Sequence, residues 1–192
     1  MAENIAKVFC GALIANHPAA DIVGANDLYG RLTGSWFAEV LDSEEDGSKR
    51  VSEGEWHFAR VLEGRGIQDL LIVPARDKRH PRAPMRFNRY GSALRIFDMK
   101  SGTWRVHWCN PSDGDIHILE ARSVADDIVE HGEGRNGAVL RWTFFDIQPD
   151  SFLARAEASA TNGGAEAWRT IAEIRATRED PTDRMLADVT RS

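Results

Sequence analysis

The sequence predicts an all-β protein: an antiparallel up-and-down β-barrel of about ten strands, preceded by a short N-terminal helical segment. Short runs rich in β-branched and aromatic residues follow one another at nearly even spacing from residue 34 onward. Turn-forming dipeptides separate these runs, and no long helical pattern intervenes. Successive strands joined by such short turns pair antiparallel, which favours a barrel or a sandwich.

The composition is that of a single globular domain. A chain of 192 residues can bury a substantial core, and 42% apolar with 28% charged residues is ordinary. The net charge of −6 argues against nucleic-acid and membrane partners. Residues 7–15 lack the flanks of a signal peptide, and no run has the length of a membrane span. We therefore expect a cytoplasmic protein.

Residues 1–33 are predicted to form the helical extension. The apolar residues of its second half recur at helical spacing: Ile22, Ala25, Leu28 or Tyr29, and Leu32. Gly34 is available to end that helix. Residues 34–178 form the predicted barrel domain, and the polar residues 179–192 form a predicted loose tail.

The predicted strands follow in chain order. They are SWFAEVLD, GEWHFARVL, GIQDLLIV, SALRIFDM, TWRVHWCN, DIHILEAR, DDIVEHG, AVLRWTFFDI, SFLARAEAS and WRTIAEIRA. One segment, residues 74–89, interrupts this rhythm because its prolines prevent regular structure. Its basic residues are Arg76, Lys78, Arg79, Arg82, Arg86 and Arg89, against the single acidic Asp77. The segment is interpreted either as a solvated excursion or as a basic lid rooted at one rim of the barrel.

The sequence gives no pattern for a metal site or a catalytic motif. Cys10 and Cys109 are the only cysteines, so a disulfide framework is not expected. His57, His107 and His117 fall on different predicted strands, where isolated histidines are more often surface residues than ligands. We expect neither a metal nor another cofactor.

The residues Gly34, Ser35 and Trp36 at the first strand, the meandering strands and an arginine at the end of the last strand resemble the calycin group. This group comprises the lipocalins, the fatty-acid-binding proteins and the nitrobindins. In lipocalins such a tryptophan closes one end of the barrel and packs against an arginine from the last strand. The resemblance implies that Trp36 closes the barrel with Arg178, or as a second candidate Arg175, on its ring.

The segments VLEGRGIQD, RWTFFDIQPDSF and TNGGAEAW are most similar to an uncharacterised bacterial lipocalin-like family, over residues 34–178. That family implies a fold and no established reaction. Haem binding in nitrobindins depends on a histidine late in the barrel, and no histidine follows His131 here. The resemblance therefore does not imply haem.

The predicted hairpins indicate which side chains face the lumen, the interior of the barrel. A turn at Glu63–Gly64 places these residues on one face: Trp56, Phe58, Arg60, Ile67, Asp69, Leu71 and Val73. Arg60 and Asp69 then lie diagonally opposite, either as an ion pair or as polar groups of a cavity. The other face of this hairpin, with Glu55 and His57, reads as exterior.

Two further hairpins leave alternatives open. A tight turn at Ser101–Gly102 groups Arg95 and Phe97 with Trp104 and Trp108, whereas a three-residue loop groups Leu94, Ile96 and Asp98 with these tryptophans. A turn at Pro149–Asp150 groups the following residues on one face: Arg141, Thr143, Phe145, Ile147, Phe152, Ala154 and Ala156. Trp142 then lies outside, which points to a homodimer surface or to reversed faces.

The expected function is to bind a small, mostly apolar molecule in an aromatic-lined lumen, with a carboxylate-bearing ligand favoured by the basic rim. The candidate ligand-binding residues are Trp56, Phe58, Arg60, Asp69, Arg95, Trp104, Trp108 and Arg141. A cofactor-independent enzyme of the cyclase, isomerase or lyase type would use the same lumen and stays an alternative. An interaction protein with a packed interior is the third.

Overall fold

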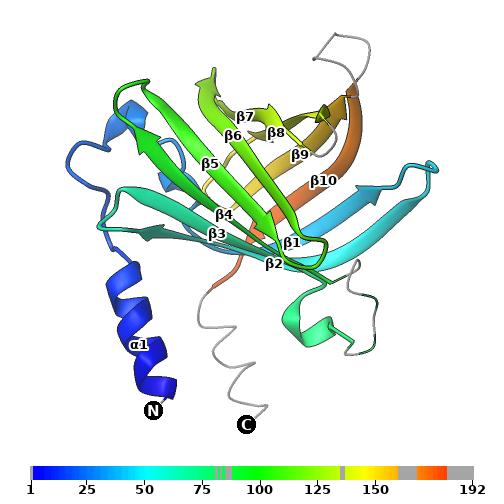
Figure 1. Cartoon of the computed structure of the whole chain (residues 1–192), viewed down its shortest axis with the longest axis horizontal. Helices are drawn as coiled ribbons and strands as arrows, with labels where there is room; N and C mark the ends of the chain where they lie inside the picture. The colour runs from blue at the N-terminus through cyan, green and yellow to red at the C-terminus, as the bar shows by residue number, and fades with distance from the viewer. Residues whose placement is uncertain are drawn as a thin grey trace.

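The computed structural model describes residues 2–80, 82, 84, 88–134, 137–159 and 168–180. Ten antiparallel strands form one closed barrel in which each strand pairs with its neighbours in sequence and the first pairs with the last (Figure 1). The strands are β1 Gly34–Ser43, β2 Lys49–Val61, β3 Gly66–Val73, β4 Arg89–Asp98, β5 Thr103–Asn110, β6 Asp115–Val124, β7 Asp127–Glu133, β8 Val139–Phe145, β9 Ser151–Ser159 and β10 Trp168–Arg178. The predicted fold class is confirmed.

The β2–β3 hairpin has the predicted register. Its cross-strand pairs include Trp56 with Leu71, Phe58 with Asp69, and Arg60 with Ile67. Because side chains alternate between the two faces of a strand, this register directs one apolar set into the barrel. In the β4–β5 hairpin, Phe97 pairs with Trp104, so the first of the two predicted groupings is correct.

The β8–β9 hairpin differs from the prediction by one residue. Trp142 pairs with Ala156 and Phe144 with Ala154, where the predicted turn pairs odd-numbered β8 residues with these alanines. A one-residue change of register exchanges the two faces of a strand. Trp142 and Phe144 therefore face the lumen, and Arg141 lies outside.

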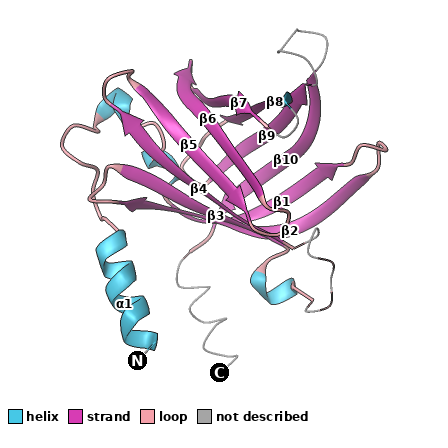
Figure 2. Cartoon of the chain, viewed as in Figure 1, coloured by secondary structure: helices cyan, strands magenta, loops and turns pink. Residues whose placement is uncertain are grey.

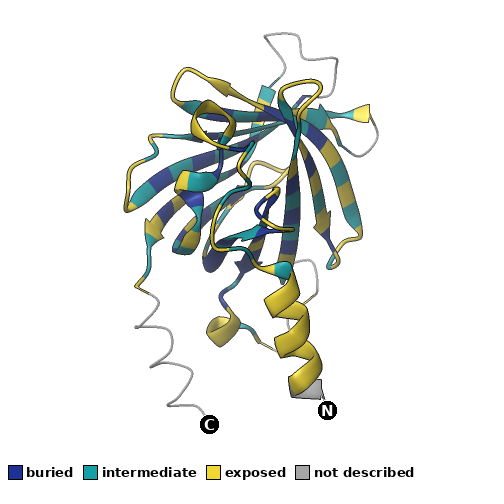
Figure 3. Ribbon diagram, turned by 90° about the vertical axis from the view of Figure 1, so that its left-hand side faces the viewer, coloured by how far each residue is buried: buried dark blue, intermediate teal, exposed yellow. Residues whose placement is uncertain are grey.

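The N-terminal helix is not where the helical spacing places it. Helix α1 spans Ala2–Leu13 and projects away from the barrel, and its described side chains are exposed except for the half-buried Leu13 at its end (Figure 3). The predicted helix over residues 20–32 is wrong, because only two 3-10 turns form there, η1 Gly24–Asn26 and η2 Gly30–Leu32 (Figure 2).

The segment between α1 and β1 instead closes one end of the barrel. Its buried side chains are Ile22, Leu28, Tyr29 and Leu32. These apolar groups enter the lumen from an irregular segment of chain. The path of this segment is therefore determined by burial against the strands and not by helical propensity. The barrel is thereby sealed at the end that contains Trp36.

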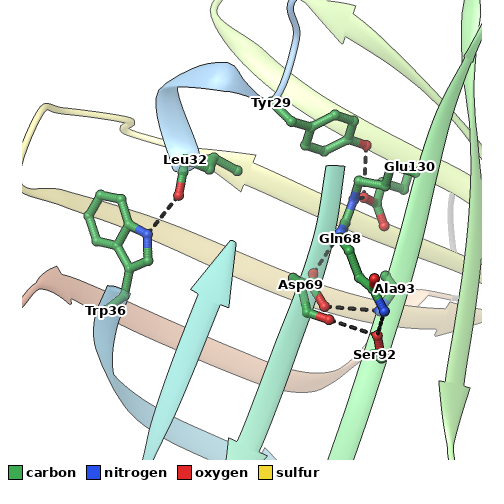
Figure 4. Close-up of polar contacts among 9 residues, drawn as sticks. Tyr29, Leu32, Trp36, Gln68, Asp69, Ser92, Ala93 and Glu130 are labelled. Atoms are coloured by element: carbon green, nitrogen blue, oxygen red, sulfur yellow. Dashed lines mark hydrogen bonds and ion pairs between the residues drawn. The ribbon is translucent and has the colours of Figure 1, made fainter. Parts of the chain in front are cut away.

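Trp36 and Arg178 meet at this sealed end. Trp36 is fully buried and donates its indole N–H to the Leu32 carbonyl, 2.8 Å away (Figure 4). The guanidinium carbon of Arg178 lies 4.0 Å from the centre of the Trp36 ring. Arg178 also donates to the carbonyl of Thr33 at 2.9 Å. Gly34 has a φ of 130°, and a Cβ there would collide with Arg178. The glycine at the start of β1 thus allows the arginine to reach the ring.

Candidate functional site

The end of the barrel opposite Trp36 contains an open cavity of about 700 Å³, called here the mouth cavity. Its apolar wall consists of Leu71, Trp108, Leu140, Trp142, Ile171 and the alanines 138, 156, 158 and 172. Short side chains line β9 and β10 on this wall, and they leave space that larger residues would fill. Gly91 on β4 makes room for the Trp108 ring of this wall, since a Cβ there would collide with the ring.

The mouth carries charges of both signs. Asp42 accepts a hydrogen bond from Arg50 at 2.8 Å and another from Arg89 at 2.7 Å. Two guanidinium groups thus share one buried carboxylate, which gives this cluster one excess positive charge. The acidic residues that also line the mouth cavity are Glu44, Glu45, Asp113 and Asp115.

His117 points into the mouth cavity. Its Nδ1 is buried and has no hydrogen-bond partner among the described residues, and its Nε2 lies 3.8 Å from an Asp115 oxygen. The histidine is not among the residues predicted to bind ligand. Its alternation with the inward-facing Leu119 and Ala121 along β6 is the sequence signal that identifies its orientation.

A smaller cavity of about 20 Å³, called here the floor cavity, lies deeper in the lumen. It shares Leu71, Trp108 and Trp142 with the mouth cavity. Its other lining residues are Trp56, Asp69, Ala93, Arg95, Leu119, Glu130 and Phe144. Four of the predicted ligand-binding residues therefore surround it.

A buried network of charges forms one side of the floor cavity. Arg95 donates to Asp69 at 2.6 Å and to Glu130 at 2.8 Å. The Tyr29 hydroxyl donates to the same Glu130 oxygen at 2.8 Å, and the backbone N–H of Ala93 donates to Asp69 at 3.0 Å (Figure 4). With both carboxylates ionised, two negative charges face one positive charge, so the network has a net charge of −1.

The pKa values of two members of this network are shifted. Burial raises the pKa of Tyr29 well above its usual value, and the nearby Glu130 carboxylate adds to this effect. Burial by itself lowers the pKa of Arg95, but the carboxylates of Glu130 and Asp69 outweigh it, so the pKa of Arg95 is raised. Tyr29 therefore stays a hydrogen-bond donor, and Arg95 stays a cation.

The predicted ion pair between Arg60 and Asp69 does not form. Arg60 lies at the sealed end of the barrel and binds Asp27 through two hydrogen bonds of 2.9 and 2.7 Å. Asp69 binds Arg95 instead. The sequence pattern misses this exchange of partners because Asp27 comes from the irregular N-terminal segment and Arg95 comes from β4, the strand next to β3. Both partners are long-range contacts.

Three other predicted ligand-binding residues line neither cavity. Arg141 lies on the outer face, where it pairs with Glu157 at 2.8 Å and stacks on Trp168. Its predicted place in the lumen is wrong because of the one-residue change in the β8–β9 register. Phe58 and Trp104 are core residues, and the Trp104 indole donates to the Asn26 carbonyl at 3.0 Å.

The described part of the basic segment 74–89 packs against the outside of the barrel. Its 3-10 turn, η3 Arg76–Lys78, is held by ion pairs from Arg76 to Glu55 and from Lys78 to Glu53. Glu55 is consequently buried although it lies on the outer face. Arg89, at the end of this segment, lines the mouth cavity. Arg86 lies outside the described residues.

His57 also lies outside the barrel, between Ser35 and Glu55 at 3.0 and 3.1 Å. In the described ranges, no group of three or more His, Cys, Asp or Glu side chains is arranged to hold a metal ion. The helices of the described part of the chain are all too short or too polar to traverse a lipid bilayer.

No family model matches the sequence, and no curated protein matches it either. Solved structures do match. Rv2717c from M. tuberculosis aligns with a TM-score of 0.60 and 12% identity over 85% of this chain and 100% of that chain. The S-type phycobiliprotein lyase CPES from Guillardia theta aligns with a TM-score of 0.57 and 11% identity over 82% and 94% of the two chains. At these identities the likeness concerns the fold, and the fold of this chain is similar to that of these calycin-like barrels.

Proposed function

We propose that this protein binds a small, mostly apolar molecule in the lumen of its barrel. The observation that carries the proposal is the mouth cavity of about 700 Å³, open at one end and walled by aromatic and aliphatic side chains. Sites for small molecules commonly have roughly 300–1,000 Å³ and a few polar groups in an apolar lining. The mouth cavity has such a volume, and its apolar wall is bordered by polar and charged residues. A packed interaction protein would not keep such a volume open.

The charge of the ligand is inferred from the cluster at the mouth. Arg50 and Arg89 both bind Asp42, so this cluster carries one excess positive charge. Guanidinium groups bind carboxylates in a fork-like geometry. A ligand that inserts its apolar body and leaves a carboxylate at the mouth suits this arrangement. The other carboxylates that line the mouth cavity oppose this attraction, so the Arg50–Asp42–Arg89 cluster is the part of the rim where a ligand carboxylate fits.

A fluorescent apolar probe tests the binding proposal. Ala158 lines the mouth cavity, so Ala158→Phe should fill part of it and weaken probe binding at least about tenfold. Ala59 lies on the outer face of β2, and Ala59→Phe is the matched control that should leave affinity unchanged. Equal affinity of wild type and Ala158→Phe would place the probe elsewhere. Native mass spectrometry of protein purified from its own host would identify a retained ligand.

Pairs of a carboxylic acid and its methyl ester test the charge of the ligand. We expect the acid to bind about tenfold more tightly at low salt, because one charge-assisted hydrogen bond contributes about 1.5–3 kcal/mol. Arg89→Gln should remove most of this preference and leave the ester unaffected. If acid and ester bind equally, without dependence on salt, the ligand is neutral and the basic residues of the mouth serve the structure alone.

A cofactor-independent enzyme acting on such a ligand is the second candidate. The observation that favours it is the titratable network of Asp69, Glu130 and Tyr29 beside the floor cavity. General acid–base chemistry needs a positioned proton donor or acceptor close to the reacting atoms. Once a ligand is identified, conversion of that ligand by wild type, and its loss in Glu130→Gln with unchanged affinity, would favour the enzyme over a binding protein.

A further inference from the structure

We infer that the floor of the lumen is a recognition subsite for a neutral hydrogen-bond acceptor, such as a carbonyl oxygen, at the inner end of the ligand, with the Trp56 indole N–H as its donor. The inference rests on the proposed binding function and adds the chemistry of the inserted end. It is independent of the carboxylate inferred for the mouth.

Trp56 has an unused hydrogen-bond donor. Its Nε1 is buried and has no hydrogen-bond partner among the described residues. The two other buried indoles behave differently, since Trp36 donates to Leu32 and Trp104 donates to Asn26. Buried indole N–H groups normally find an acceptor, so an unpaired one requires an explanation.

An acceptor can reach the Trp56 N–H only from within the lumen. The Trp56 ring is 2% exposed and is enclosed by lumen side chains. The ring centres around it lie at 5.1 Å for Phe58, 5.4 Å for Phe152, 5.6 Å for Phe144 and 6.5 Å for Trp142. Trp56 lines the floor cavity, and the mouth cavity adjoins it at Leu71, Trp108 and Trp142. A ligand entering from the mouth therefore approaches Trp56 with its inner end.

The size of the floor cavity limits what can enter it. The floor cavity has about 20 Å³. A space of about 10–15 Å³ on this measure holds one water molecule. The floor cavity therefore accommodates one oxygen atom of a ligand, while the apolar body of the ligand stays above it in the mouth cavity.

The charge of the floor cavity excludes ionised ligand groups. The Asp69–Arg95–Glu130 network that lines the floor cavity has one excess negative charge, so a carboxylate would be repelled there. A protonated amine would suit the two carboxylates, but it has no lone pair to accept the Trp56 N–H. A neutral carbonyl, ether or ring nitrogen satisfies the donor without adding charge.

The test compares ketones with hydrocarbons of the same shape, in which CH₂ replaces C=O. Three pairs cover different sizes: fluorenone and fluorene, benzophenone and diphenylmethane, and 2-acetylnaphthalene and 2-ethylnaphthalene. In the wild type we expect the ketone of the best-fitting pair to bind at least about tenfold more tightly, with its carbonyl stretching band shifted to lower frequency. In Trp56→Phe the two members should bind equally.

Two controls complete the experiment. Trp142→Phe removes an indole that lines both cavities and should weaken ketone and hydrocarbon alike, so that the preference remains. If Trp56→Phe does not fold, β-(3-benzothienyl)alanine at position 56 keeps the bicyclic shape and removes the N–H. A ketone preference that is absent in wild type, or that survives loss of the Trp56 N–H, overturns this inference. If none of the six probes binds wild type, the proposed binding function itself fails.

Discussion

At the scale of single residues, the buried Asp69–Arg95–Glu130 network dominates the energetics of the lumen. Asp69→Ala leaves Arg95 with Glu130 as its only carboxylate and leaves the Ala93 N–H without its acceptor. Removing one partner of a buried ion pair commonly costs 3–5 kcal/mol. Because Glu130 remains, we expect a loss of about 3 kcal/mol in the free energy of unfolding.

Denaturant titration of the variant and its control measures this loss. The exposed pair between Arg155 and Glu173 provides the control, and Arg155→Gln should cost at most about 1 kcal/mol. A similarly small loss for Asp69→Ala would mean that solvent reaches the lumen floor and screens the network there.

Tyr29 makes stability depend on pH in the alkaline range. Its pKa in the folded protein is raised above the unfolded value of about 10, chiefly by burial. Above pH 10 the unfolded chain therefore loses a proton that the folded chain keeps. Stability from this group is fully present below pH 10 and falls above it, by up to about 1.4 kcal/mol per pH unit.

Unfolding curves between pH 8 and 11.5 compare the wild type with Tyr29→Phe. The variant should be less stable near neutral pH, since it loses the hydrogen bond to Glu130, and should decline less steeply above pH 10. The exposed Tyr90 is the other tyrosine of the chain, and Tyr90→Phe should retain the wild-type slope. Identical slopes for wild type and Tyr29→Phe would contradict burial of the hydroxyl.

At the scale of elements, α1 and the segment that follows it contribute very differently. Ile5, Val8 and Phe9 of α1 are each about two-thirds exposed, whereas Leu32 is fully buried. Deleting residues 1–12 should therefore change the free energy of unfolding by less than about 1 kcal/mol, because little apolar area is lost from the core.

Leu32→Ala is the comparison for this deletion and should cost 2–5 kcal/mol, the usual range for a buried leucine. Thermal unfolding of both proteins ranks them directly. A truncated chain as unstable as Leu32→Ala would show that α1 packs against the barrel in solution.

The hairpins show why some elements follow from sequence and others do not. The β2–β3 register is predictable because alternation and the turn at Glu63–Gly64 agree. In β8 the alternation is weak, because the aromatic residues Trp142, Phe144 and Phe145 fall on both faces of the strand. Turn length alone then decides the register, and the turn between β8 and β9 is one residue longer than expected. The wrong prediction that Arg141 faces the lumen follows from this longer turn.

At the scale of the whole molecule, closure of the barrel depends on the contact between its first and last strands, β1 and β10. Arg178 at the end of β10 stacks on Trp36 of β1 and donates to carbonyls of Thr33 and Pro149. Arg178→Ala should lower the free energy of unfolding by about 2 kcal/mol, from the lost cation–π contact and hydrogen bonds.

Amide hydrogen exchange locates the effect of this substitution. Exchange should accelerate first in β1 and β10, where the barrel would open, and less in β4 and β5 on the far side of the strand order. Uniform acceleration across all strands would mean that the arginine stabilises the fold generally and does not fasten this seam.

The sequence by itself determines about ten antiparallel strands and the lumen face of β2–β3, because alternation and turn residues act over short distances along the chain. The choice of a barrel and the approach of an arginine to Trp36 are what the resemblance to the calycin group implies. The tertiary structure decides which charges meet. Arg60 finds Asp27, Asp69 finds Arg95, and Arg95 also finds Glu130 of β7, a strand that does not pair with β4. A local pattern indicates the face on which a charge lies, but its partner depends on how the sheet closes, because a buried charge pairs with whichever opposite charge the closed barrel brings within reach.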